Sequence, residues 1–73
     1  MQYKFTATFT NCQDYIDVAF HDLHGLITFG MDEEEAVYMA EDALGGYLAA
    51  LVQLGWDIPA DSGIGNRAVT VTI

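Results

Sequence analysis

Basic residues are almost absent from this chain, because Lys4 and Arg67 are the only two among its 73 residues. Proteins that bind nucleic acid neutralise phosphates with lysine and arginine, so direct nucleic-acid binding by this segment is not expected. Cysteine is equally scarce, and the lone Cys12 excludes an internal disulfide. There is no apolar run long enough to span a membrane and no signal-peptide pattern at the start. These absences predict a cytoplasmic protein.

Acidic and apolar residues are abundant instead. Eleven Asp and Glu residues give a formal net charge of -9, and 52% of the residues are hydrophobic. The charge would attract a basic partner and speed its association. We expect residues 1–73 to form one small domain with a core of modest size. Because such a core cannot hide all the apolar area, the composition predicts a homo-oligomer or a partner interface.

Alternation of apolar and polar residues indicates four β-strands. Residues 2–10 alternate strictly, with aromatic and β-branched side chains, as in a half-buried strand. A second strand is predicted at 15–20 and a short third strand at 26–29, separated by a turn in which Gly25 is free to adopt a positive φ. Residues 67–73 alternate again and predict a fourth strand. At these spacings the first three strands should form an antiparallel meander.

Between the third and fourth strands the period changes to that of a helix. Asp32 and Glu35 form a capping box, and the predicted helix runs to about Leu54, with Gly55 as its C′ residue and Pro59 preventing continuation. The apolar residues that recur at helical spacing should lie on the sheet: Ala36, Ala40, Ala43, Leu44, Tyr47, Leu51 and Leu54. The predicted fold class is α+β, in the order βββαβ, with one helix packed on a mainly antiparallel four-stranded sheet.

Two constellations invite a chemical interpretation. His21 and His24 are three residues apart, but no second histidine or cysteine cluster completes a metal site, and exposed turn histidines are the simpler explanation. The carboxylates are not fixed together by any nucleophile motif or phosphate loop, so we expect no enzyme activity. Cys12 has no basic neighbour in the sequence, so there is no reason to assign a reactive thiol. No cofactor is predicted.

Two features of the helix are candidates for contacts with other molecules. The run from Asp32 to Glu35 suits the positive end of the helix dipole, and the same carboxylates could face a basic partner; the two interpretations are compatible. Two adjacent glycines inside a helix each cost about 1 kcal/mol relative to alanine. Gly45, Ala49 and Val52 form a stripe of small residues that would allow another backbone to approach, although plain tolerance of the glycines is the alternative.

Residues 19–59 follow an ordered pattern of D-L-x-G, a short strand ending in glycine, an acidic capping run, an Ala/Leu-rich helix, and G-x-x-I-P. This pattern resembles the HicB family of bacterial antitoxins. The positions that match the family are Tyr3, Phe5, Phe20, Asp22, Leu23, Gly25, Thr28, Gly30, Asp32, Glu34, Glu35, Ala36, Ala40, Ala43, Leu44, Tyr47, Leu48, Gly55, Ile58, Pro59 and Ser62. His21 and His24 stand where the family usually has proline, and Asp61 replaces a proline before Ser62.

The resemblance implies a partial RNase H-like fold without nuclease chemistry. It also implies a partner, a small basic HicA-like toxin that cleaves mRNA, which the antitoxin masks. The partner-binding residues we expect are Asp32, Glu33 and Glu34, with Asp22 as a further candidate, and the oligomer contact would be the Gly45 stripe. Family antitoxins usually continue into a DNA-binding domain, and none is expected within this chain. The alternative function is a HicB-like oligomeric binding or structural module with no toxin partner.

Overall fold

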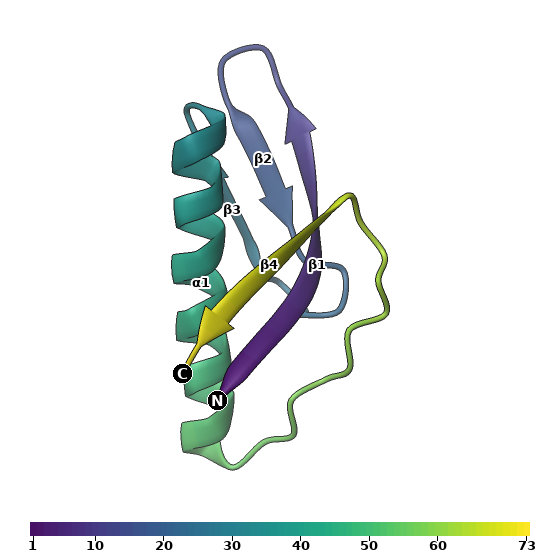
Figure 1. Cartoon of the computed structure of the whole chain (residues 1–73), viewed down its shortest axis with the longest axis vertical. Coiled ribbons are helices and arrows are strands. Elements are labelled where there is room, and N and C mark those ends of the chain that lie inside the picture. Colours follow the sequence, from purple (N-terminus) through teal and green to yellow (C-terminus); the bar gives the residue numbers. More distant parts are fainter.

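A computed structural model describes residues 1–73 and has an α+β fold, as predicted. The elements follow the order β1 (Gln2–Asn11), β2 (Ile16–Ala19), β3 (Ile27–Gly30), α1 (Glu33–Leu54) and β4 (Arg67–Thr72). One helix lies along one face of the sheet (Figure 1). The predicted βββαβ arrangement is confirmed, and each element begins and ends within two residues of its predicted bounds. The helix is not long and apolar enough to cross a membrane.

The four strands form one antiparallel sheet in the order β3-β2-β1-β4. The first three strands make the predicted meander, in which Val18 pairs with Phe9 on one side and with Thr28 on the other. The last strand returns to the long first strand, so that Phe5 pairs with Val69. The two ends of the chain therefore lie side by side (Figure 1). This pairing leaves β3 and β4 as the two edges of the sheet.

The hydrophobic core lies between the sheet and α1. On β1 the alternation predicted from sequence places Phe5 and Ala7 in the core, with Tyr3 and Phe9 packed at its margin. The buried helix residues are Ala36, Ala40, Leu44, Leu48 and Leu51, and Leu23 closes the core from the loop between β2 and β3. Burial of large aliphatic side chains such as Leu44 contributes about 1.5–3 kcal/mol each.

The helix face predicted from periodicity is correct except that it includes Leu54 and omits Leu48. Leu54 was expected on the sheet, but 61% of its surface is exposed. It is the last helical residue, and the final turn of α1 extends beyond the sheet (Figure 1). Leu48, which the predicted stripe omitted, is fully buried. The core face of the helix is therefore centred slightly differently from the predicted one.

The start of α1 lies directly on the end of β3. Gly30 is buried there, and a Cβ at this position would lie 2.3 Å from the backbone nitrogen of Ala36. Ordinary contacts between heavy atoms need roughly 3.5 Å, so any side chain would push the helix off the strand. The absence of a side chain at Gly30 thus sets how closely the first helical turn, with its acidic residues, approaches the sheet.

A long connection joins α1 to β4. It begins at Gly55, whose φ of 74° gives the left-handed C-terminal cap predicted from sequence, and the Trp56 N–H donates to the carbonyl of Leu51 at 2.9 Å. The connection is then held to the sheet by hydrogen bonds. Asn66 makes two of these to the backbone of Phe9, at 2.8 and 2.9 Å. These contacts fix where β4 begins, and they therefore place Arg67 opposite the helix start.

Candidate partner-binding surface

The acidic run at the start of α1 is organised by the predicted capping box. Asp32 has an extended backbone, and its side chain accepts a hydrogen bond of 2.8 Å from the Glu35 N–H. The Glu35 carboxylate in turn accepts a bond of 2.8 Å from the Met31 N–H. One unpaired donor of the first helical turn, the Glu35 N–H, and the N–H of Met31 just before the cap are satisfied in this way. The carboxylates also lie at the favourable end of the helix dipole. Both side chains therefore have a structural role.

All four members of the run are exposed to solvent, but the carboxylates of Glu33 and Glu34 take no part in the cap. Glu33 accepts a bond of 3.0 Å from Arg67, in an ion pair in which 74% of the Glu33 side chain is still accessible. The Arg67 guanidinium lies 5.3 Å from the centre of the Phe9 ring, which it also contacts. An exposed pair of this kind contributes about 0.2–1 kcal/mol. Glu34 has no such partner, and its carboxylate is free to meet another molecule.

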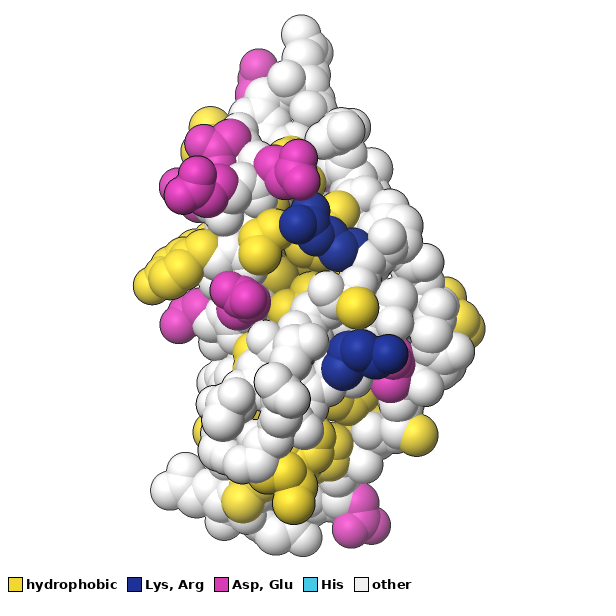
Figure 2. Space-filling model, viewed as in Figure 1, with side chains coloured by type: hydrophobic (Ala, Val, Ile, Leu, Met, Phe, Trp, Pro, Cys, Tyr) yellow, Lys and Arg dark blue, Asp and Glu magenta, His cyan; other side chains and the backbone are white.

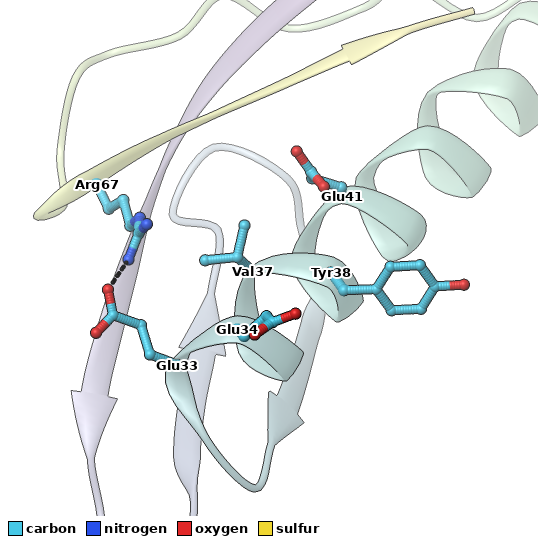
Figure 3. Close-up of a pocket in the computed structure, with 6 residues that line it drawn as sticks. All are labelled: Glu33, Glu34, Val37, Tyr38, Glu41 and Arg67. Atoms are coloured by element: carbon cyan, nitrogen blue, oxygen red, sulfur yellow. Dashed lines mark hydrogen bonds and ion pairs between the residues drawn. The ribbon is translucent and has the colours of Figure 1, made fainter.

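A groove runs between α1 and the last strand. Near the helix start it encloses about 540 Å³ and is lined by Glu33, Glu34, Val37, Tyr38, Glu41 and Arg67. Figure 3 shows Glu33 reaching across to Arg67, Val37 lying between α1 and β4, and Tyr38 pointing outward. The groove continues along Tyr38, Glu41, Asp42, Gly45, Gly46 and residues Thr70 to Ile73. We call this whole feature the α1–β4 groove.

The groove has an acidic rim and a partly apolar lining. Figure 2 shows acidic side chains gathered along the helix, with hydrophobic side chains between them and the two basic residues. Glu34, Glu41 and Asp42 are all exposed on the helix side. On the strand side the only charge is that of Arg67, which is already paired with Glu33. The surface is therefore suited to a ligand that is basic and partly apolar.

The Gly45 stripe borders the same region. Gly45 lines the α1–β4 groove, while Ala49 and Val52 line a neighbouring hollow together with Met1, Tyr3, Gln53 and Ile73. The stripe therefore lies at the side of the helix that faces β4 and the ends of the chain. A Cβ added at Gly45 would meet no atom within 4 Å. The glycine is therefore not required for packing within the chain.

Asp22 lies apart from the other predicted partner-binding residues. It is in the loop before β3, whereas Asp32, Glu33 and Glu34 follow that strand, so they are at opposite ends of β3. Its carboxylate accepts bonds from the Ser62 N–H at 2.7 Å and from the Ser62 hydroxyl at 2.9 Å. Asp22 thus ties the loop before β3 to the connection before β4, which is a structural role.

Asp61 has an analogous role that sequence reasoning missed. Its carboxylate accepts bonds from the Thr6 N–H at 3.1 Å, the Gly63 N–H at 3.1 Å and the Thr6 hydroxyl at 3.3 Å. These donors, chiefly the Thr6 N–H and then that of Gly63, lower the pKa of Asp61, and the nearby charge of Lys4 acts in the same direction. On the side of β1 that faces β2, the pairing begins only at Thr8, so β2 does not reach Thr6. The Asp61 carboxylate occupies this unpaired position. Only the strand register could have revealed this position.

The other face of the sheet carries an exposed apolar patch. Ile27, Phe29 and Met31 are exposed by 70, 55 and 62% respectively. The ring of Tyr15 packs edge-on against that of Phe29, with centroids 5.9 Å apart. A hydrogen bond with Cys12 is the main cause that raises the pKa of Tyr15. We refer to Tyr15, Ile27, Phe29 and Met31 as the outer apolar patch.

The predicted exposure of the two histidines is confirmed, since His21 and His24 are both exposed in the loop after β2. The contact near His24 involves its backbone carbonyl, which accepts a bond of 3.2 Å from the Tyr47 hydroxyl. No group of three or more histidine, cysteine or acidic side chains lies close enough to hold a metal ion. The geometry at these histidines offers no ligand set.

Comparison with known proteins gave one family. The model of the family described as "HicB_like antitoxin of bacterial toxin-antitoxin system" matches residues 2–73 of this chain. The match spans all four strands and the helix. No curated protein and no solved structure was found to match the chain. The family assignment therefore rests on the sequence match, and the fold agrees with the arrangement that the resemblance implied.

Proposed function

This chain belongs to the HicB-like antitoxin family, and on that premise we propose that it binds and masks a small, basic, HicA-like toxin that cleaves mRNA. Inhibition would result from covering the toxin's RNA-binding surface and active site, with no chemical step by the antitoxin. The proposed compartment is the cytoplasm, where the mRNA target is found. We propose that residues 1–73 act as one HicB-like domain and take no part in nucleic-acid contacts, because only two basic residues are present.

The observation that carries this proposal is the exposed acidic rim of the α1–β4 groove. Glu33 and Glu34 stand at the helix start, where the capping bond of Asp32 fixes the backbone that presents them. A fixed acidic surface on a chain of net charge -9 would steer a basic partner into contact and raise the association rate. We leave Asp22 outside the proposed surface because it is bonded to Ser62 at the other end of β3.

Reversing the charge of the rim tests the proposal. In the double variant Glu33→Lys with Glu34→Lys, a HicA-like toxin should associate about tenfold more slowly at low salt, with a flatter salt dependence and a less affected dissociation rate. The control is Asp14→Lys with Asp57→Lys, which changes the net charge equally at two exposed positions outside the groove. Stopped-flow measurement at several salt concentrations gives both rates. Equal association rates for wild type and the Glu33/Glu34 variant would place the docking surface elsewhere.

The outer apolar patch supports a second candidate, a homo-oligomeric binding or structural module. Its side chains, Tyr15, Ile27, Phe29 and Met31, are exposed on one side of the sheet, and covering them with a second copy would remove apolar surface from water. The free edge of β4 and the Gly45 stripe are the other routes to self-association. A homodimer would be seen by sedimentation at tens of micromolar protein. A monomer at that concentration would contradict this candidate and leave the toxin complex as the only proposed assembly.

A further inference from the structure

The free edge of β4 presents hydrogen-bonding groups that no strand of this chain uses. Met1 and Ile73 exchange both backbone bonds, the Met1 amine donating to Ile73 at 2.6 Å and the Ile73 N–H donating back at 2.9 Å. Since bonded pairs alternate along an antiparallel ladder, the odd-numbered residues of β4 face β1. The N–H and C=O groups of Ala68, Thr70 and Thr72 therefore point outward.

This edge lacks several of the features that usually protect an edge strand. In natural proteins, lysine, proline, a bulge or a very short strand keeps an edge from pairing with another chain. The sequence of β4 contains neither lysine nor proline, and its single charge, Arg67, lies at its beginning and is paired with Glu33. The opposite edge, β3, is only 4 residues long, whereas β4 has 6. The last strand is thus the better template for an added strand.

The space beside the edge is open along the helix. The α1–β4 groove lies next to β4, and Gly45 and Gly46 line it at the level of Thr70 to Ile73. Nothing lies within 4 Å of where a side chain on either glycine would begin. A strand added to β4 would therefore have room for an inward-facing side chain over these glycines, with Tyr38, Glu41 and Asp42 lining the rest of the groove.

Charge decides between a second copy of the chain and a basic partner. A second copy would bring another net charge of -9 to a groove whose helix side already carries Glu34, Glu41 and Asp42. A basic strand would instead place alternate side chains against those carboxylates. We propose that an extended, basic segment of the toxin adds to β4 as an antiparallel or parallel fifth strand, with its inward-facing side chains in the α1–β4 groove. This inference rests on the proposed toxin-binding function.

Thr70→Pro tests the added strand directly. The Thr70 N–H points away from β1, so proline there removes an edge donor and places a ring at the edge without removing a bond within the sheet. The control is Thr70→Val, which keeps the N–H and changes the side chain. We expect Thr70→Pro to bind the HicA-like toxin at least about tenfold more weakly than Thr70→Val. Circular dichroism of each free variant verifies that it is folded.

Hydrogen exchange on the unmodified protein gives a readout that needs no variant. The amides of Ala68, Thr70 and Thr72 should exchange quickly in the free protein and slow by at least about tenfold in the toxin complex. The amides of Val69 and Val71 already face β1 and should change much less. This alternation is specific to strand addition, since simple coverage of the surface would not distinguish neighbouring residues.

Each outcome has a distinct meaning. Weaker toxin binding by Thr70→Pro together with the alternating protection supports the added strand. A wild-type complex with no alternating protection, and with equal affinities for Thr70→Pro and Thr70→Val, overturns it while leaving the proposed toxin-binding function intact. If Thr70→Pro converts a dimer of the free protein to a monomer and leaves toxin affinity unchanged, a second copy occupies the edge and the inference is wrong. If the wild type forms no complex, the proposed function fails and the inference fails with it.

Discussion

Replacing Gly30 by alanine perturbs the contact that holds the acidic helix start over the sheet. The new Cβ would lie 2.3 Å from the nitrogen and 2.6 Å from the Cα of Ala36, and 2.7 Å from the carbonyl carbon of Glu35. All three are backbone atoms of the first helical turn, so no side-chain rotation can relieve the overlap. Either α1 moves away from β3 or the end of β3 bends.

The size of the effect follows from this geometry. Reaching an ordinary contact of about 3.5 Å requires a displacement of roughly 1 Å, which would loosen the packing of Ala36 and Ala40 in the core. Overpacking costs about 1–3 kcal/mol. A clash that involves the backbone of both β3 and α1 belongs at the upper end of that range, ~3 kcal/mol. A chain of this length has a total stability of about 4–11 kcal/mol. The expected loss corresponds to a fall in Tm of about 12–24 °C.

Thermal unfolding followed by far-ultraviolet circular dichroism measures this effect, with Gly46→Ala as the matched control. That variant adds the same methyl group, but no atom lies within 4 Å of the new Cβ, and the site is inside α1. Alanine is favoured over glycine in a helix, so Gly46→Ala should stabilise the fold by about 0.5–1 kcal/mol. Opposite signs for the two substitutions are expected. A Tm for Gly30→Ala within about 2 °C of the wild type would refute the steric argument.

Three further results are expected from equilibrium unfolding. Because the fold lowers the pKa of Asp61, its stabilising contribution is fully present above the unfolded pKa, near 4, and is lost as the pH falls through the lower folded value. The stability difference between wild type and Asp61→Asn should therefore shrink as urea titrations are taken from pH 6 towards pH 2, and a constant difference would contradict the assignment. Asp32→Ala should cost about 1 kcal/mol, and no loss would mean that the capping bond contributes nothing. Leu44→Ala should cost about 2–5 kcal/mol, and a cost below 1 kcal/mol would show that its site in the core collapses around the smaller residue.

The parts of the structure that were predicted correctly depend on local sequence. The period-two alternation of residues 2–10 and the capping box of Asp32 and Glu35 are determined by neighbours a few residues away, and both are confirmed. The αL cap at Gly55 belongs to the same class. The misplaced Leu54 shows the limit of this reasoning. Periodicity assigns a helix face but does not tell where the sheet beneath the helix ends.

The parts that were not predicted depend on where β4 lies. Its pairing with β1 joins residues at opposite ends of the chain, and no local pattern specifies that neighbour. The ion pair between Glu33 and Arg67, the bonds from Thr6 to Asp61 and the α1–β4 groove all follow from this pairing. The candidate residues in the helix were therefore identifiable from sequence, but the surface that they share with β4 was not.

The carboxylates of this chain fall into two groups, those that accept hydrogen bonds within the chain and those that face solvent along α1. The net charge alone does not distinguish the two groups. Asp22, Asp32, Glu35 and Asp61 accept hydrogen bonds from this chain's own donors, and they hold loops and the helix start in place. Glu34, Glu41 and Asp42 are exposed along one side of α1, next to the outward-facing backbone of β4. A basic strand placed there would meet complementary charge and unused hydrogen-bonding groups together. If the antitoxin proposal is correct, charge reversal at the rim should therefore act mainly on association, whereas Thr70→Pro should act mainly on dissociation.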